Sequence, residues 1–122
     1  MMTDLILRTR RRADALHVTV IGALDLRTAD EIRSRIVEMV DTADTPPAVA
    51  VDLRCCTNVD ITGLTALADA RTAARDRSGD LRLEGVPPLV EHLIHTHRLA
   101  GRLPTTGLAD QPPGPGELTS PV

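Results

Sequence analysis

Two stretches near the start of the chain are predicted to form strands, and the second alternates hydrophobic and polar residues, which is typical of a strand with one buried face. The first covers residues 4–8, and the second covers residues 16–22, where Leu16, Val18 and Val20 alternate with polar residues. We expect these two strands to pair as a hairpin around an arginine-rich loop.

Two longer segments repeat hydrophobic residues every three or four positions, a period that predicts amphipathic helices. The first spans residues 28–42, and its Thr28 and Glu31 match a capping box, in which the Thr28 hydroxyl accepts a hydrogen bond from the Glu31 amide. The second begins at Asp60 or Thr62, either of which can serve as the N-cap, and it ends before a Ser-Gly stop signal.

Shorter runs between and after these helices predict further strands and a third helix. Residues 48–53 are almost continuously apolar, which fits a central strand buried on both faces of a sheet. Leu81 and Leu83 alternate with charged residues and predict another strand. Pro87 and Pro88 then open a third helix, because proline suits the first turn of a helix. The inward side of that helix is expected to hold Val90, Leu93, Ile94 and His97.

The predicted order is therefore β-β-α-β-α-β-α, with a short additional strand near Leu103. Strands that alternate with helices in this way indicate an α/β fold with a mixed, mostly parallel sheet of four to five strands and three main helices. We expect one domain over residues 1–106. Residues 107–122 are rich in proline and glycine and are predicted to form a disordered tail.

Composition narrows the classes of function. The chain has 122 residues, a formal net charge of −3 and no Phe, Tyr or Trp. The overall charge gives no reason to expect nucleic acid or an acidic membrane as a partner, and base stacking on aromatic side chains is excluded. The basic run Arg8, Arg10, Arg11 and Arg12 is interpreted as a solvated loop, with an anion-binding arm as the alternative.

The cysteines and the apolar segments suggest a cytoplasmic protein. No stretch approaches the roughly 20 apolar residues that a membrane span needs. The two cysteines are the neighbours Cys55 and Cys56, which cannot frame a disulfide-stapled fold. We expect Cys56 to point inward as a small hydrophobic residue and Cys55 to point outward.

Two groups of residues invite a catalytic or metal-binding interpretation. Three histidines lie near the end of the third predicted helix: His92, His95 and His97. Their helical spacing does not let all three converge on one ion, so no metal site is expected. Three acidic residues lie near strand ends: Asp25, Asp52 and Asp60. Because no catalytic histidine, nucleophile or glycine-rich phosphate loop accompanies them, they do not indicate an enzyme, and no cofactor is expected. Asp52 is interpreted as the end of its strand.

Several of these segments together resemble the STAS domain. They are Gly22-Ala23-Leu24-Asp25 at the end of a strand, the strand at 48–53, and Val59-Asp60-Ile61-Thr62-Gly63-Leu64 at the start of a helix. Residues 86–94 also resemble the final helix of that family. In length and pattern, the chain is similar to bacterial anti-sigma factor antagonists, and the resemblance covers residues 4–106.

The resemblance implies a regulatory switch without catalysis. Members of this family bind an ATP-dependent anti-sigma factor that is also a serine kinase, and they thereby free the sigma factor. Phosphorylation of the serine after the motif's aspartate releases the anti-sigma factor, and a serine/threonine phosphatase reverses the modification. The implied partner-binding residues are Asp25, Asp60, Ile61, Thr62, Gly63 and Leu64.

The chain departs from the family at the switch itself. Ile61 follows Asp60, so the usual phosphoacceptor hydroxyl is missing, and Thr62 is the nearest candidate. Either Thr62 is phosphorylated instead, or the site is silent and binding is constitutive. We favour the silent site, because an N-cap role would account for Thr62 without phosphorylation.

Two other functions remain open from the sequence. The first is a STAS subunit of a larger scaffold or lipid-transport complex. The second is a small nucleotide-binding protein that uses Asp25, Asp60 and Thr62. We expect the chain to be a monomer or a weak dimer.

Overall fold

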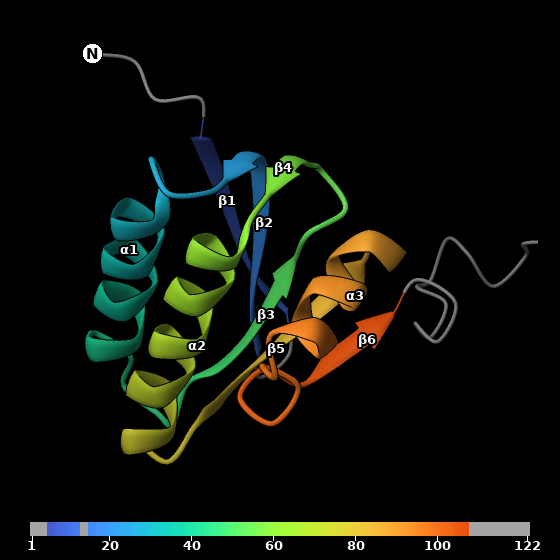
Figure 1. The fold of residues 1–122 in the computed structure, drawn as a ribbon. Coiled ribbons are helices and arrows are strands. Elements are labelled where there is room, and N and C mark those ends of the chain that lie inside the picture. Colours follow the sequence, from blue (N-terminus) through green and yellow to red (C-terminus); the bar gives the residue numbers. More distant parts are fainter. Residues whose placement is uncertain (1–4, 13–14, 108–122) are drawn as a thin grey trace, which may run out of the picture.

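The computed structural model describes residues 5–12 and 15–107 of the chain (Figure 1). The elements follow in the order β1 (Leu5–Arg12), β2 (Ala15–Leu24), α1 (Ala29–Asp41), β3 (Ala48–Asp52), β4 (Cys56–Val59), α2 (Ile61–Asp76), β5 (Asp80–Val86), α3 (Pro88–Thr96) and β6 (Thr105–Gly107). The segment predicted as a disordered tail lies outside the described residues, apart from Gly107, which ends β6.

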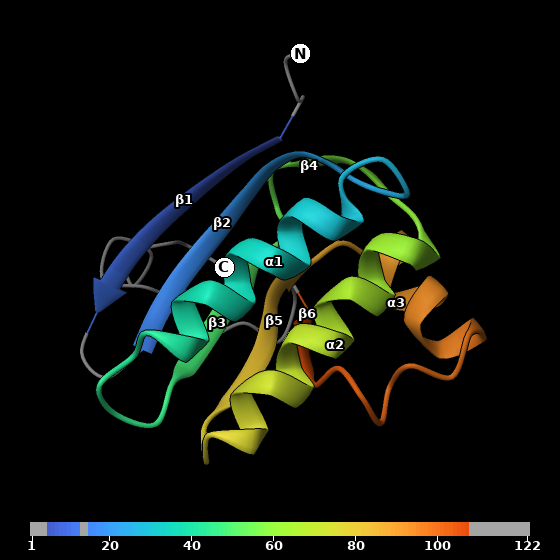
Figure 2. The same ribbon diagram turned by 90° about the vertical axis from the view of Figure 1, so that its left-hand side faces the viewer.

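The sheet is mixed and mostly parallel, as predicted. Its strands lie in the order β1-β2-β3-β5-β6, and the short β4 pairs with β2 near the end of β2. Only β1 runs antiparallel to its neighbour among the described strands. Helices α1 and α2 lie side by side over one face of the sheet, and α3 lies beside α2 on the side of β6 (Figure 2). The predicted α/β class is confirmed.

The core lies between the sheet and the helices and contains aliphatic side chains. The predicted stripe of α1 is buried, with Ile32, Ile36 and Val40 fully inaccessible to solvent. The apolar run that becomes β3 is the central strand, and its Val49 and Val51 are paired with Leu81 and Leu83 of β5 in the same core. Val49, Ala50 and Val51 are all buried in this strand, which lies between β2 and β5 in the sheet.

The arginine-rich segment is not a loop, so that prediction is wrong. Strand β1 continues through Arg12, and its Arg10 pairs with His17 of β2. The strand can continue through charged residues because β1 is at the edge of the sheet and these side chains are exposed. Exposed charges are common on edge strands, since they remain solvated there.

The inward stripe of the third helix is shorter than predicted. Val90 and Ile94 are buried, but His97 is exposed and forms the C-cap of α3. The chain turns away here, because Arg98 adopts a left-handed conformation (φ 59°) and the Leu99 amide donates a hydrogen bond to the Ile94 carbonyl. This arrangement is a common way to end a helix and takes His97 off the core face.

Candidate partner-binding site

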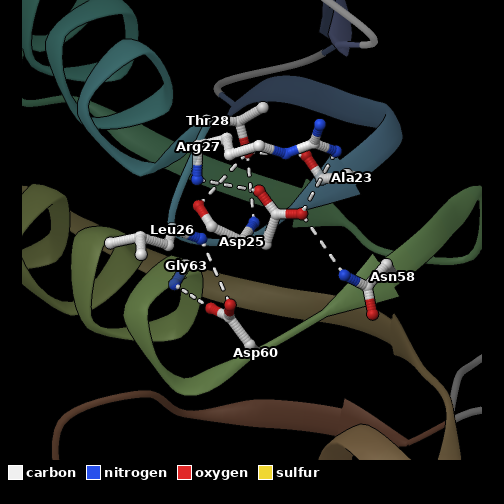
Figure 3. A network of polar contacts seen from close by, with 8 residues as sticks. All are labelled: Ala23, Asp25, Leu26, Arg27, Thr28, Asn58, Asp60 and Gly63. Atoms are coloured by element: carbon white, nitrogen blue, oxygen red, sulfur yellow. Dashed lines mark hydrogen bonds and ion pairs between the residues drawn. The ribbon is translucent and has the colours of Figure 1, made fainter.

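The predicted site residues gather where β2 ends and α2 begins. Parallel strands bring their carboxyl ends to one edge of the sheet, so the turn between β2 and α1 lies next to the start of α2. The backbone amide of Asp60 donates a hydrogen bond to the Leu24 carbonyl over 3.0 Å, which joins the two segments directly. Figure 3 shows the polar contacts that surround this junction.

Asp60 holds the turn and the helix together. One carboxylate oxygen, Oδ1, accepts a hydrogen bond from the Gly63 amide at 3.0 Å and caps α2. The other, Oδ2, accepts a hydrogen bond from the Leu26 amide at 3.2 Å. The prediction of Asp60 as N-cap is confirmed, whereas the alternative N-cap, Thr62, is wrong, because Thr62 lies inside the first turn of α2.

Asp25 stabilises the turn from within. Only 7% of this residue is exposed, and its Oδ1 accepts a hydrogen bond from the Arg27 amide at 3.0 Å. Its Oδ2 accepts a hydrogen bond from the Asn58 side-chain amide at 3.3 Å and lies 3.8 Å from the Arg27 guanidinium. The two carboxylate oxygens of Asp25 therefore shape the surface, and the side chain presents little of itself to a partner.

Thr28 does not form the predicted capping box. Its hydroxyl donates a hydrogen bond to the Ala23 carbonyl at 2.7 Å and accepts one from the Asp25 amide at 3.1 Å (Figure 3). The backbone of Thr28 is already helical (φ −109°, ψ −7°), and no side-chain bond caps α1. Since an N-cap side chain reaches the helix from an extended backbone, the Thr28 hydroxyl instead bonds back to the turn.

Gly63 and Leu64 position the start of α2 against β2 and the core. A Cβ atom on Gly63 would lie 2.3 Å from the Leu24 carbonyl oxygen, so only glycine allows α2 to approach β2 this closely. The side chain of Leu64 is fully buried in the core. These two residues position the start of α2 and do not offer side chains to a partner in this structure.

The outward side of the site is formed by Leu26, Ile61 and Thr62. Leu26 was not predicted, and 72% of it is exposed on the turn that Asp25, Thr28 and Asp60 hold in place. Its side chain points away from the polar network (Figure 3). Ile61 is half-buried against the core, and Thr62 is also half-buried. An apolar residue in the middle of a polar turn was the sequence signal that could have identified Leu26.

The remaining candidates lie apart from this site. His92, His95 and His97 are exposed, and His92 Nε2 lies 3.4 Å from the Thr96 hydroxyl. Across residues 5–12 and 15–107, no group of three or more His, Cys, Asp or Glu side chains is arranged to hold a metal ion. No helix in the same residues is long and apolar enough to cross a membrane.

The two cysteines face opposite environments, as predicted. Cys55 is exposed, and Cys56 is partly buried with its Sγ 3.7 Å from the Val20 carbonyl oxygen. Burial, together with the nearby Cys55 and Asp52, raises the pKa of the Cys56 thiol to about 12. Cys56 therefore remains protonated at neutral pH and packs as a small apolar side chain.

The fold matches solved structures over most of the chain. A crystal structure of an anti-sigma factor antagonist from Mycobacterium paratuberculosis is 24% identical, with a TM-score of 0.70 over 83% of this chain and 84% of that chain. The unphosphorylated form of the anti-sigma factor antagonist SpoIIAA is 13% identical, with a TM-score of 0.67 over 82% and 87%. A sulfate transporter family protein from Wolinella succinogenes is 18% identical, with a TM-score of 0.60 over 77% and 78%.

Sequence comparison assigns the family. Among curated proteins, no sequence matches the chain significantly. The profile of the family described as "Mlab, STAS domain" matches residues 7–106, which include the whole region from β1 to β6 apart from a few terminal residues. The chain therefore belongs to the STAS domain family, and its fold is that of the anti-sigma factor antagonists.

Proposed function

We propose that this protein is a cytoplasmic anti-sigma factor antagonist, which binds an anti-sigma factor of the ATP-binding serine kinase type and so frees a sigma factor. Membership of the STAS family supports a binding module. The similarity in fold to two anti-sigma factor antagonists supports this kind of partner. We further propose that the domain has no enzymatic activity, because the carboxylates of Asp25 and Asp60 are both engaged in hydrogen bonds within the protein.

The observation that carries this proposal is the exposed Leu26 on a fixed turn. The Leu26 amide is bound by Asp60, and the residues on either side are held by Asp25 and Thr28. An apolar side chain on an ordered backbone loses little conformational entropy when a partner covers it. Leu26 can therefore fill an apolar pocket of a partner protein at a small entropic cost.

Replacement of Leu26 with Asp tests the surface. We expect Leu26→Asp to weaken binding of the partner anti-sigma factor about tenfold or more, because a charge would be buried in an apolar contact. The measurement is titration calorimetry against anti-sigma factors of the ATP-binding serine kinase type from the host. Circular dichroism should show an unchanged fold, because the side chain contributes nothing to the core.

Leu89→Asp is the matched control for this experiment. Leu89 is also a leucine, is 74% exposed and lies in the first turn of α3, outside the turn between β2 and α1. It should retain the wild-type affinity. Equal affinities for wild type and Leu26→Asp would contradict the proposed surface, and so would equal losses in the two variants.

The sulfate transporter match favours a second candidate, a subunit of a larger assembly. Size-exclusion chromatography with light scattering on cell extract separates the two functions. A small complex with one ATPase supports the antagonist, and a large particle supports the assembly.

A further inference from the structure

Strand β1 carries a group of arginines that have no acidic partner among residues 5–12 and 15–107. The arginines are Arg8, Arg10, Arg11 and Arg12, all exposed, and within the described residues none of them forms an ion pair or a side-chain hydrogen bond. Most arginines elsewhere contact a carboxylate or a backbone oxygen: Arg27, Arg33, Arg35, Arg54, Arg71, Arg75, Arg77, Arg82 and Arg102. In the part of the chain that the structure describes, positive charge without an ion pair is therefore concentrated on this strand.

Three of these arginines form a row along the edge of the sheet. Arg8, Arg10 and Arg12 occupy alternate positions of β1 and so project from the same face, with a spacing of about 6.8 Å between neighbours. Arg11 projects from the other face. Strand β1 is the terminal strand of the sheet, and in the described part of the chain no strand pairs with its outer edge.

The charge on β1 determines which strands can pair with its outer edge. Backbone N–H and C=O groups on the outer side of a terminal strand can pair with another extended segment. Pairing with β1 of a second copy would place arginines opposite arginines, and like charges across strands are destabilising. Glutamate or aspartate at every second position of the incoming strand would instead lie opposite the row.

We propose that the outer edge of β1 is a docking site for an acidic, extended segment of a partner protein, which adds to the sheet as a further strand. Its backbone pairs with the free edge, and its alternate carboxylates pair with Arg8, Arg10 and Arg12. The row is a single strand wide, and the chain has a net charge of −3 and no aromatic residue. A narrow row of this kind fits one extended peptide better than the broad surface of a nucleic acid or a membrane.

The arginine row is separate from the turn that carries Leu26. Arg8, the member of the row nearest to the turn, pairs with Thr19, whereas the turn begins after Leu24, so five residues of β2 separate the two surfaces. Five residues of strand span about 17 Å. Both surfaces can therefore be occupied at once, and the docking edge does not depend on the function proposed for the turn.

The experiment measures binding of a short peptide in which glutamate alternates with valine and threonine. A second peptide has the same composition, with its glutamates adjacent, and a third is the alternating peptide with N-methylated backbone amides. The full 122-residue chain is compared with Arg10→Glu and with Arg11→Glu, which makes the same charge change on the opposite face of β1. Circular dichroism checks that both variants fold.

We expect the alternating peptide to bind the wild-type chain more tightly than either of the other peptides. Arg10→Glu should weaken binding about fivefold to tenfold, because one attractive cross-strand pair becomes repulsive. Arg11→Glu should weaken it by less than about twofold. Hydrogen exchange of the β1 amides should slow in the presence of the peptide, because a new strand would protect the edge.

Several results would overturn the proposal. The first is the absence of binding by the alternating peptide, and the second is equal binding of all three peptides. Equal losses in Arg10→Glu and Arg11→Glu would indicate attraction without strand addition. Tighter binding of a single-stranded DNA oligonucleotide, or of vesicles that contain phosphatidylglycerol, would assign the row to a different class of partner.

Discussion

At the scale of single residues, the close approach between α2 and the end of β2 leaves no space for a side chain at Gly63. We expect Gly63→Ala to lower the free energy of unfolding by about 1–3 kcal/mol, because the added methyl group meets the Leu24 carbonyl and both segments must shift. Urea denaturation followed by circular dichroism measures the loss. Gly101→Ala is the control, since a Cβ atom there meets nothing within 4 Å. Similar stabilities for the two variants would show that the junction is more tolerant than its geometry indicates.

The residues of the site were predictable to different degrees. Asp60 was identified as one of two candidate N-caps because an aspartate before a helical repeat is a local signal. Its second contact, to Leu26, joins residues 34 positions apart and depends on the order of the strands. Thr28 has the right neighbours for a capping box, but the Ala23 carbonyl at the end of β2 takes its hydroxyl instead. The contact from Asp60 to Leu26 depends on the tertiary fold, whereas Thr28 bonds to a residue five positions earlier, because the turn after β2 brings that carbonyl close to its hydroxyl.

At the scale of elements, the start of α2 combines a helix N-terminus with a residue that cannot be phosphorylated. We propose that Ile61 leaves this site silent, and that the kinase-type partner therefore does not modify the wild-type chain. Ile61→Ser would restore a hydroxyl where a helix N-terminus stabilises a phosphate. We expect the intact mass of Ile61→Ser to increase by one phosphate after incubation with the partner and ATP, while the wild-type mass does not change.

Thr62 provides the control for that experiment. If the wild-type chain gains a phosphate, and Thr62→Val abolishes the gain, then Thr62 is the acceptor and the site is not silent. If neither the wild type nor Ile61→Ser is modified by a partner that binds both, the partner does not act as a kinase on this helix. Either result would contradict the proposal that Ile61 alone keeps the site from being modified.

The helices and strands were predicted correctly from the sequence wherever the repeat of hydrophobic residues extended over enough positions. Helices α1 and α2 and strand β3 were predicted to within a residue or two, because burial imposes a clear pattern on them. Strand β4 was missed, since its four residues include two exposed ones and it pairs only with β2 among the described strands. The end of β1 was also misplaced, because an exposed edge strand accepts arginines that resemble a loop.

At the scale of the whole molecule, Asp80 and Arg71 connect three parts of the fold. Arg71 Nε, on α2, donates a hydrogen bond to the Asp80 carboxylate at the start of β5 over 2.7 Å. The same guanidinium bonds the Arg102 carbonyl, in the segment before β6, at 3.0 Å. The hydrogen bond from Arg71 is the main cause that lowers the pKa of Asp80 below its usual value of 3.8.

The lowered pKa of Asp80 predicts a dependence of stability on pH. Because the folded-state pKa lies below the unfolded one, the contribution is complete above about pH 4 and is lost as the pH falls through the folded value. Asp80→Asn should therefore lower the free energy of unfolding modestly at pH 7, since the carboxylate is half exposed, and the difference from wild type should shrink below pH 4. Urea denaturation between pH 7 and pH values below 4 measures the free energy of unfolding of the wild type and of Asp80→Asn. If the difference in free energy of unfolding between the two proteins did not change with pH, the role of the Asp80 charge would be contradicted. Asp44→Asn is the control, because the Asp44 carboxylate is exposed in the loop after α1.

The aliphatic core described above also has an optical consequence. A protein without tyrosine or tryptophan emits no intrinsic fluorescence of its own in the near ultraviolet. In a mixture with any partner that contains tryptophan, the whole emission comes from that partner. A shift of the emission spectrum during titration therefore reports burial of the partner's tryptophan side chains. Binding can be followed in this way without a dye or a label.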